Sequence, residues 1–169
     1  MNLVLIGYRG TGKSAVAARL ARSLGRPVMG LDAEIVRRAG KSIPEIVAAG
    51  GWKAFRDLES EVARDAAAGD GLIIDCGGGI IERPENVEAL RRNGVVIWLK
   101  ASVGVIVKRI EGGTERPALT AGKSFTDEVA EVLARRTPIY ERSADAVVDT
   151  DDKTVAQVVE AVMDEWNRR

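Results

Sequence analysis

The sequence predicts an α/β fold in which one parallel β-sheet is covered by helices on both faces. Two observations predict it. Short apolar runs alternate along the chain with segments whose apolar residues recur at helical spacing. The runs are apolar throughout, which is typical of strands that are buried on both faces. With 169 residues, and no internal repeat or low-complexity linker, the chain is expected to form a single domain over 1–169.

Five strands and seven helices are expected. The predicted strands are Leu3–Ile6, Pro27–Met29, Leu72–Ile74, Val95–Leu99 and Ala146–Val148. The predicted helices are Ala15–Leu24, Asp32–Ala39, Ile43–Ala49, Trp52–Ala68, Val103–Ile110, Asp127–Arg142 and Thr154–Trp166. Gly25 and Gly40 end the first two helices. Ser42, with Pro44 in the first turn and Glu45 three residues on, predicts a capped start for the third helix.

A glycine-rich loop joins the first predicted strand to the first predicted helix. It reads Gly7-Tyr8-Arg9-Gly10-Thr11-Gly12-Lys13-Ser14, with the G-x-x-x-x-G-K-S spacing of a P-loop. In such a loop, backbone N–H groups bind phosphate oxygens, the lysine reaches the β- and γ-phosphates, and the hydroxyl ligates Mg²⁺. A glycine-rich turn that binds nothing is the alternative, and the strand–loop–helix context favours nucleotide binding. The predicted nucleotide contacts are Gly10, Thr11, Gly12, Lys13, Ser14 and Ala15, with Lys13 expected in a solvated loop.

The composition limits the possible chemistry and partners. There are 25 basic and 25 acidic residues, so no global basic field favours nucleic acid as a partner. The chain has no histidine and a single cysteine, Cys76, which argues against histidine-based triads and protein zinc sites and leaves hard metals such as Mg²⁺. One cysteine, no recognisable export signal and no apolar run of about 20 residues together predict a cytoplasmic protein with no membrane partner. It is expected to act as a monomer.

Two acidic residues follow predicted strands. Asp75 ends the third strand, where a P-loop protein holds Mg²⁺; a turn-capping aspartate is the alternative. Asp32 follows the second strand at the edge of the sheet where ligands bind, and it could equally cap a helix. After Asp75 come Gly77, Gly78 and Gly79, which indicate either a close approach to the backbone or a turn through positive φ, with a flexible surface loop as a weaker alternative.

One long segment, Glu111 to Lys123, contains glycines, a proline and few apolar residues. It could be an ordinary solvated loop. Loops of this length inside compact domains are usually functional or disordered, and next to a P-loop we favour a mobile lid that carries Arg116 over a phosphate site. The lid is expected at about 111–125.

Taken in order, these motifs resemble the shikimate kinase family over nearly the whole chain. The motifs are the P-loop, Leu31-Asp32-x-x-Ile35, Ala39 to Ile46, Phe55-Arg56-x-x-Glu59, Gly77-Gly78-Gly79, Arg116-Pro117 and Arg136-x-Pro138-x-Tyr140. The resemblance implies a three-layer P-loop kinase fold with a substrate-binding helical segment at about 32–62. It also implies transfer of the ATP γ-phosphoryl to the 3-hydroxyl of shikimate, giving shikimate 3-phosphate and ADP on the route to chorismate and aromatic amino acids.

The resemblance also implies roles on the acceptor side. Asp32 would bind substrate hydroxyls, Arg56 and Arg136 would hold the carboxylate, and Glu59 would orient Arg56. The backbone of Gly77, Gly78 and Gly79 would contact the ring. Spacing alone favours a surface ion pair for Arg56 and Glu59, because residues three apart share a helix face. Pro138 is expected to interrupt the helix beside Arg136.

On the nucleotide side, the resemblance makes Lys13, Asp32 and Arg116 catalytic, with Arg116 covering the phosphates of ATP. Arg109 and Lys153 fall where the family contacts adenine. The family has an aspartate two residues before Asp32 that helps to hold Mg²⁺, and here that position is Gly30. We therefore expect Ser14 and Asp75 to hold the metal, with Asp75 replacing the missing aspartate.

Three other functions remain open at this point. A kinase for another small carboxylated polyol, such as gluconate, would use the same two arginines. A P-loop binding or regulatory module without turnover is supported only by Gly30, and Lys13, Asp32 and Arg116 argue against it. A nucleic-acid-binding ATPase fits least well because the net charge is zero.

Overall fold

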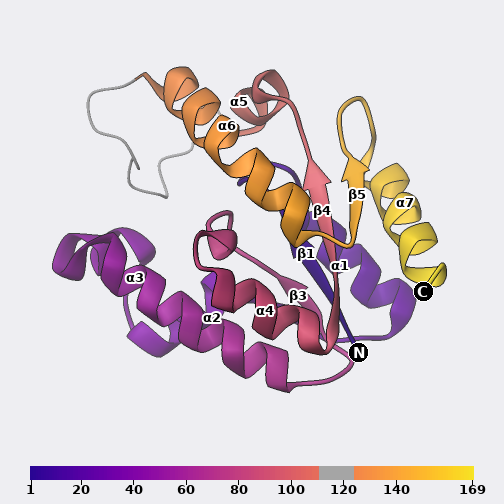
Figure 1. Ribbon diagram of the computed structural model, residues 1–169, viewed down its shortest axis with the longest axis horizontal. Helices are drawn as coiled ribbons and strands as arrows, with labels where there is room; N and C mark the ends of the chain where they lie inside the picture. Colours follow the sequence, from indigo (N-terminus) through magenta and orange to yellow (C-terminus); the bar gives the residue numbers. More distant parts are fainter. Residues whose placement is uncertain (111–123) are drawn as a thin grey trace.

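The computed structural model describes residues 1–110 and 124–169. In this part of the chain five parallel strands form one sheet in the order β2-β3-β1-β4-β5 (Figure 1). The strands are β1 Asn2–Ile6, β2 Val28–Gly30, β3 Ile73–Asp75, β4 Gly94–Lys100 and β5 Ala146–Asp149. Each predicted strand is found, displaced by at most one residue at either end, so the predicted five-stranded parallel sheet is confirmed.

Helices cover both faces of this sheet and give the predicted three layers (Figure 1). They are α1 Lys13–Leu24, α2 Leu31–Ala39, α3 Ile43–Ala68, α4 Pro84–Arg92, α5 Val103–Ile110, α6 Phe125–Ser143 and α7 Val155–Asn167, with a 3₁₀ turn η1 at Ile80–Glu82. Helices α1 and α7 pack on one face, and α2 to α6 lie on the other. No helix of the described residues is long and apolar enough to cross a lipid bilayer.

Strand β1 shows why the predicted strands are apolar throughout. Leu3 and Leu5 contribute to the core beneath α1 and α7, whereas Val4 and Ile6 contribute to the core beneath the other helices. Successive side chains of a strand point to opposite faces of the sheet, and both faces of β1 are covered. The strand therefore has no position at which a polar side chain would reach water.

The helix boundaries follow their predicted signals closely. Ser42 and Glu45 form a capping box at the start of α3, as the sequence predicts. Gly25 and Gly40 end α1 and α2 in the left-handed region, with φ of 62° and 65°. Asp32 lies in the first turn of α2 and Gly30 is its N-cap, so the alternative interpretation of Asp32 as an N-cap is wrong.

The two helices predicted on either side of Gly51 are both found; they meet within α3 at Gly51, whose φ of 76° and ψ of 178° are not helical. Two other helical details differ from the prediction. Helix α4, which begins with Pro84 at its first turn, was not predicted. Helix α6 continues through Pro138, because Pro138 and Ala134, whose carbonyl loses its N–H partner, are both exposed to water.

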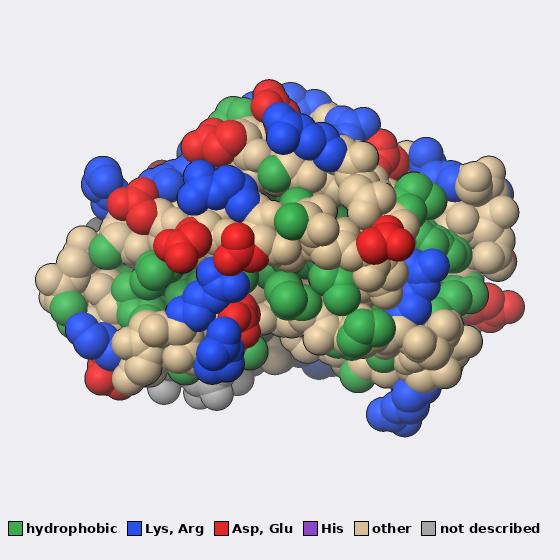
Figure 2. Space-filling model, turned by 90° about the horizontal axis from the view of Figure 1, so that it is seen from below, with side chains coloured by type: hydrophobic (Ala, Val, Ile, Leu, Met, Phe, Trp, Pro, Cys, Tyr) green, Lys and Arg blue, Asp and Glu red, His purple; other side chains and the backbone are tan. Residues whose placement is uncertain are grey.

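Charge is evenly mixed on the face of the molecule that Figure 2 shows. Basic and acidic side chains alternate over this face and are not gathered by sign. This face therefore offers no continuous basic field for a nucleic acid, which agrees with the balanced composition.

Candidate active site

The P-loop connects β1 to α1 at the carboxyl edge of the sheet, where its glycines take conformations that other residues resist. Gly7, Gly10 and Gly12 have φ of 147°, 83° and 90°. A Cβ on Gly7 would also lie 2.5 Å from the carbonyl oxygen of Leu99 in β4. Gly12 is the N-cap of α1 and offers no side chain to its first N–H groups. Those groups are therefore available to phosphate oxygens.

Lys13 is more buried than the sequence indicates. Only 7% of its surface is exposed, and Nζ donates to the carbonyl oxygens of Gly7 at 2.8 Å and Tyr8 at 3.0 Å. The expectation of a solvated lysine is wrong, because the loop curls around the ammonium group and supplies it with backbone acceptors. These bonds hold a positive charge inside the loop, at the position from which a P-loop lysine reaches phosphate.

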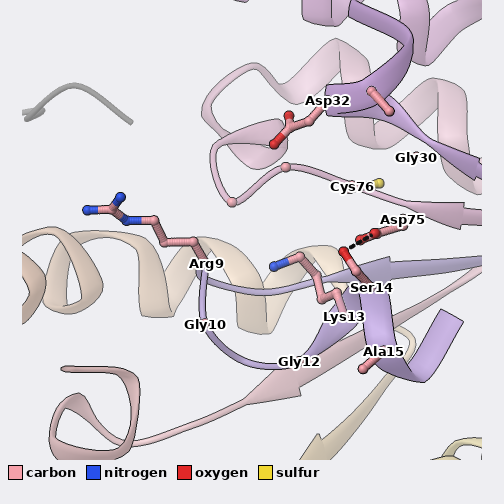
Figure 3. Close-up of a pocket in the computed structure, with 13 residues that line it drawn as sticks. Arg9, Gly10, Gly12, Lys13, Ser14, Ala15, Gly30, Asp32, Asp75 and Cys76 are labelled. Atoms are coloured by element: carbon pink, nitrogen blue, oxygen red, sulfur yellow. Dashed lines mark hydrogen bonds between the residues drawn. The ribbon is translucent and has the colours of Figure 1, made fainter. Parts of the chain in front are cut away.

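A cavity of about 430 Å³ opens in front of the P-loop (Figure 3). Its lining combines residues of the P-loop and the start of α1 with residues at and just after the ends of β2 and β3, namely Arg9, Gly10, Gly12, Lys13, Ser14, Ala15, Gly30, Asp32, Ala33, Asp75, Cys76, Gly77 and Gly78. The volume lies within the range of small-molecule sites, about 300–1,000 Å³. We call it the P-loop cavity.

Ser14 and Asp75 meet in this cavity, as Figure 3 shows. The hydroxyl of Ser14 donates to Oδ2 of Asp75 at 2.6 Å. Burial raises the pKa of Asp75 above its usual value, and the nearby Asp32 adds to this, while Ser14 and Lys13 act in the opposite direction. The pair places a hydroxyl and a carboxylate, both oxygen ligands of the kind that Mg²⁺ binds, on the same wall of the cavity.

The three consecutive glycines allow three functional side chains to approach the backbone. A Cβ on Gly77 would lie 2.8 Å from Oδ1 of Asp32, and one on Gly78 would lie 3.4 Å from Nη1 of Arg136. A Cβ on Gly79 would collide with the guanidinium of Arg56. None of the three has positive φ, so close approach is confirmed and the alternative of a left-handed turn is wrong.

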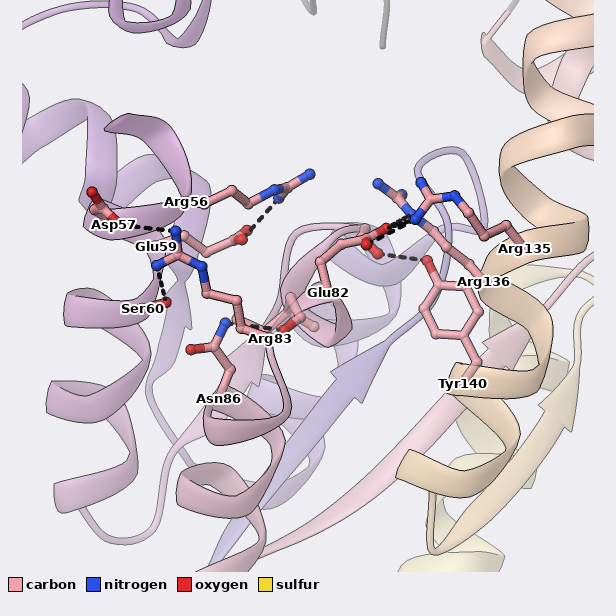
Figure 4. A network of polar contacts seen from close by, with 12 residues as sticks. Arg56, Asp57, Glu59, Ser60, Glu82, Arg83, Asn86, Arg135, Arg136 and Tyr140 are labelled. Carbon is pink, nitrogen blue, oxygen red and sulfur yellow. Dashed lines mark hydrogen bonds and ion pairs between the residues drawn. The ribbon is translucent and has the colours of Figure 1, made fainter. Parts of the chain in front are cut away.

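Arg56 and Arg136 reach from opposite sides into a second space (Figure 4). Arg56 comes from α3 and donates from Nη1 to Oε1 of Glu59 at 2.8 Å; Arg136 comes from α6 and donates from Nε to Oε1 of Glu82 at 2.7 Å. Glu59 is fully buried. Spacing alone favoured a surface ion pair for Arg56 and Glu59, and that interpretation is wrong because this face of α3 points inward.

Between these arginines lies a cavity of about 390 Å³, which we call the arginine cavity. Its lining is predominantly charged and consists of Trp52, Arg56, Glu82, Arg83, Glu131, Val132, Arg135 and Arg136. Gly78, which lines the P-loop cavity, lies beside the guanidinium of Arg136. The structure thus brings an anion-binding loop and a pair of arginines together around one glycine segment.

The comparison with known families decides what this arrangement is. A model of the family described as Shikimate kinase matches residues 9–167. The chain belongs to the shikimate kinase family. Its activity is accordingly that of a shikimate kinase, an ATP-dependent phosphotransferase of aromatic biosynthesis.

Individual members of the shikimate kinase family agree over the full length. The shikimate kinase of Symbiobacterium thermophilum is 40% identical over 170 aligned residues, covering 100% of this chain and 98% of the relative. That of Nitratidesulfovibrio vulgaris is 44% identical over 161 residues, covering 94% and 91%. Among solved structures, shikimate kinase from Acinetobacter baumannii in complex with shikimate has a TM-score of 0.94 at 28% identity, covering 99% of this chain and 93% of that one.

The family motif Arg136-x-Pro138-x-Tyr140 has a structural meaning beyond its arginine. The hydroxyl of Tyr140 donates to the carbonyl oxygen of Gly78 at 2.5 Å, and its ring stacks on Trp98 with centroids 5.4 Å apart. Burial raises the pKa of Tyr140 well above its usual value, so the hydroxyl keeps its proton. Tyr140 therefore fixes Gly78, beside which Arg136 lies.

The residues expected near adenine lie together around Thr150. Arg109 donates to Oγ1 and the carbonyl oxygen of Thr150, both at 3.2 Å, and to the carbonyl oxygen of Gly10 at 3.4 Å. Lys153 donates from Nζ to the carbonyl oxygen of Asp149 at 2.7 Å. Arg109 thereby links the P-loop to the segment after β5. Neither residue lines the P-loop cavity.

Two expectations lie partly or wholly outside the described residues. Arg116 is among residues 111–123, as is most of the predicted lid at about 111–125. Ser124 caps α6 and Phe125 is its first residue. One residue of the arginine cavity was missed altogether: Glu82 bonds both Arg135 and Arg136, which are 53 and 54 residues away, and no local pattern in the sequence indicates this pairing.

Proposed function

We propose that this chain transfers the γ-phosphoryl group of Mg²⁺-bound ATP to the 3-hydroxyl of shikimate, with the nucleotide in the P-loop cavity and the carboxylate of the acid in the arginine cavity. One observation carries the proposal. The glycine segment 77–79 links the two cavities: Gly77 and Gly78 line the P-loop cavity, and Arg136 and Arg56, which line the arginine cavity, approach Gly78 and Gly79. A phosphate donor and a carboxylated acceptor would therefore meet at a common wall.

The carboxylate of shikimate would lie between Arg56 and Arg136. Each arginine is bonded to a glutamate through one of its nitrogens, which leaves other donors of the planar guanidinium for a ligand. Two such groups supply charge-assisted bonds of fixed geometry, which a lysine could not reproduce. This arrangement supports a carboxylated substrate, but it does not distinguish shikimate from another small acid.

Asp32 would bind the acceptor hydroxyls. It lines the P-loop cavity opposite Lys13 and lies in the first turn of α2, where the positive end of the helix favours a carboxylate. A carboxylate there can accept a hydrogen bond from the attacking hydroxyl and align it with the γ-phosphate. Positioning and charge stabilisation dominate phosphoryl transfer, so alignment is the larger part of this role.

Ser14 and Asp75 would hold Mg²⁺. Their oxygens lie 2.6 Å apart on the wall of the P-loop cavity, and hard oxygen donors of this kind suit the ion. Within the described residues no group of three acidic, cysteine or histidine side chains could form a complete metal cage. A partial site fits an ion that takes its remaining ligands from water and nucleotide phosphates. When bound, the ion would neutralise charge on the phosphates.

The remaining assignments extend the same proposal. Arg116 would cover the transferring phosphoryl group, while Arg109 and Lys153 would contact adenine. Cys76 is buried, and a single buried cysteine is compatible with a reducing cytoplasm. We propose a cytoplasmic monomer that takes shikimate and ATP as its small-molecule partners.

A coupled assay of ADP release with shikimate, quinate and gluconate tests the substrate. We expect turnover with shikimate and, at equal concentrations, only background with the other two. Faster turnover with gluconate than with shikimate would mean that the chain is a kinase for another carboxylated polyol. No turnover with any of the three acids would favour a binding module. Arg56→Lys and Arg136→Lys should each raise the KM for shikimate by about tenfold or more with little change in the KM for ATP, because lysine lacks the planar fork.

A further inference from the structure

Glu82 closes η1 just beyond the glycine segment and bonds two consecutive arginines of α6 (Figure 4). Oε1 accepts from Nε of Arg136 at 2.7 Å, and both carboxylate oxygens accept from Nη1 of Arg135 at 2.9–3.0 Å. Burial opposes ionisation here, but the bonds to Arg135 and Arg136 outweigh it and hold the pKa of Glu82 below its usual value. Glu82 is therefore an anion at neutral pH.

The Arg136 guanidinium is held on three sides. The carboxylate of Glu82 accepts a hydrogen bond from Nε of Arg136. The centre of the Tyr8 ring lies 5.6 Å from the central carbon of the guanidinium, and Gly78 lies beside Nη1. The side chain of Arg136 is 5% exposed, whereas that of Arg135 is 56% exposed. Of the two arginines that Glu82 bonds, only Arg136 is thus fixed in direction, with its terminal nitrogens turned toward Arg56 (Figure 4).

The arginine cavity is lined by four arginines and two glutamates, and its charge is balanced only by carboxylates that pair with these arginines from outside the lining. Glu82 lies 2.7 Å from Arg136 within the lining, while Glu59 and Asp57 lie outside it, each 2.8 Å from its partner, Arg56 and Arg83 respectively. A cavity of this kind does not attract anions through a large net charge. Its selectivity must come from the direction in which the remaining N–H donors point.

We propose that Glu82 is a positioning and specificity-determining residue that aims Arg136 at a planar carboxylate and cancels the charge that would otherwise attract compact anions. The inference rests on the proposed role of Arg136 in binding the acceptor. A carboxylate has only one pair of oxygens to present to the guanidinium fork, whereas a tetrahedral anion can present several, so a carboxylate gains most from a fixed Arg136. Sulfate is doubly charged and tetrahedral, so it gains most from excess positive charge.

Two variants of Glu82 separate direction from charge. Glu82→Gln keeps the size and one acceptor oxygen and removes the charge. Glu82→Asp keeps the charge and draws the carboxylate back from Nε of Arg136. Binding of shikimate is measured by calorimetry with saturating Mg²⁺ and ADP, which occupies the P-loop, and sulfate is measured by its displacement of shikimate under the same conditions.

Both variants should weaken shikimate binding, on the order of tenfold, because Arg136 loses a charge-assisted bond that fixes its direction. Sulfate should bind more tightly to Glu82→Gln, because the loss of the carboxylate leaves an extra positive charge in the cavity. The affinity of Glu82→Asp for sulfate should equal that of the wild type. The KM for ATP should stay within about twofold in both. A fold that is merely damaged would not tighten sulfate binding, so the opposite responses of the two anions distinguish positioning from structural support.

Two matched controls complete the experiment. Glu88→Gln removes one exposed charge from α4, the helix that follows η1, and should change the binding of neither shikimate nor sulfate. Arg135→Gln removes the outer partner of Glu82, and should affect shikimate less than either Glu82 variant does. Parallel changes for shikimate and sulfate in Glu82→Gln, or unchanged shikimate binding in both variants, would overturn the inference. If Arg136→Lys also left shikimate binding unchanged, the proposed carboxylate site itself would be wrong.

Discussion

Gly30 and Asp75 are register partners on the neighbouring parallel strands β2 and β3. Side chains of paired residues on adjacent strands project from the same face of a sheet, so a carboxylate at either position would point into the same part of the P-loop cavity. Both residues line that cavity. We therefore propose that Asp75, whose carboxylate accepts from Ser14 one strand across, takes the place of the carboxylate missing at Gly30.

Replacing Asp75 by serine should raise the Mg²⁺ concentration needed for half-maximal rate by about 10–100-fold, the usual cost of losing a partner of a bound metal or its waters. The measurement is a Mg²⁺ titration of the initial rate at constant free ATP. Adding Gly30→Asp to that variant should recover part of the loss. A Cβ at Gly30 would meet only that of Ala33, at 3.8 Å, so there is room for the new side chain.

Asp75→Asn serves as the control for this series, because it retains an acceptor for the Ser14 hydroxyl and removes only the charge. It should resemble Asp75→Ser in its Mg²⁺ dependence. An unchanged Mg²⁺ requirement in both variants would reduce Asp75 to a structural partner of Ser14.

Gly79→Ala should weaken shikimate binding while leaving the fold nearly as stable. The new methyl group would collide with the guanidinium of Arg56, which is the end of a flexible side chain and can move aside. A displaced Arg56 loses its geometry, so the KM for shikimate should rise about tenfold or more and the melting temperature should change little. Gly104→Ala in α5, where a Cβ meets nothing within 4 Å, is the matched control. An unaltered KM in Gly79→Ala would mean that Arg56 does not touch the acceptor.

Lys13→Ala should abolish phosphoryl transfer, lowering kcat by at least about 10²–10³-fold, because a charge aimed at the transferring group is lost. It should also lower the melting temperature, since the carbonyl oxygens of Gly7 and Tyr8 lose their buried donor. Single-turnover rates and thermal unfolding measure the two effects separately. Near-normal turnover would remove Lys13 from the mechanism, and an unchanged melting temperature would show that water replaces its bonds to the loop.

The stability contributed by Glu34 should disappear in acid. Hydrogen bonds from Arg37 and Arg38 lower the pKa of Glu34 from 4.5 to about 2. Since the folded-state value is depressed, the contribution is complete above about pH 4.5 and is lost as the pH falls toward 2. Thermal unfolding of the wild type and Glu34→Gln should therefore differ at pH 7 and converge near pH 2. Glu160→Gln, at an exposed position of α7, should show no such convergence.

The sequence predicts best what local patterns determine. The strand at β1, the P-loop glycines and the capping box at Ser42 each depend on residues within one short segment. The meaning of the Gly77–Gly79 segment was predictable only in part. A close approach could be anticipated, but the side chains that approach come from α2, α3 and α6.

What the sequence missed depends on contacts between distant segments. Spacing puts Arg56 and Glu59 on one face of α3, but it cannot tell which face of the helix turns inward. The bond between Glu82 and Arg136 joins residues 54 apart, and its existence follows from how α6 packs on η1. Burial of Lys13 likewise follows from the loop curling around its own ammonium group, which a residue pattern does not reveal.

The central position of β1 fixes when the nucleotide site can form during synthesis. β1 and the P-loop leave the ribosome before the two strands that flank β1, which lie at Ile73–Asp75 and Gly94–Lys100. Gly7 packs against the Leu99 carbonyl, so the loop lacks its support until β4 has emerged. Long-range pairing of this kind forms late, because a large loop of chain must close first. The nucleotide site is therefore incomplete until β4 has been made, and only after that point can ligand binding help to protect the chain from misfolding.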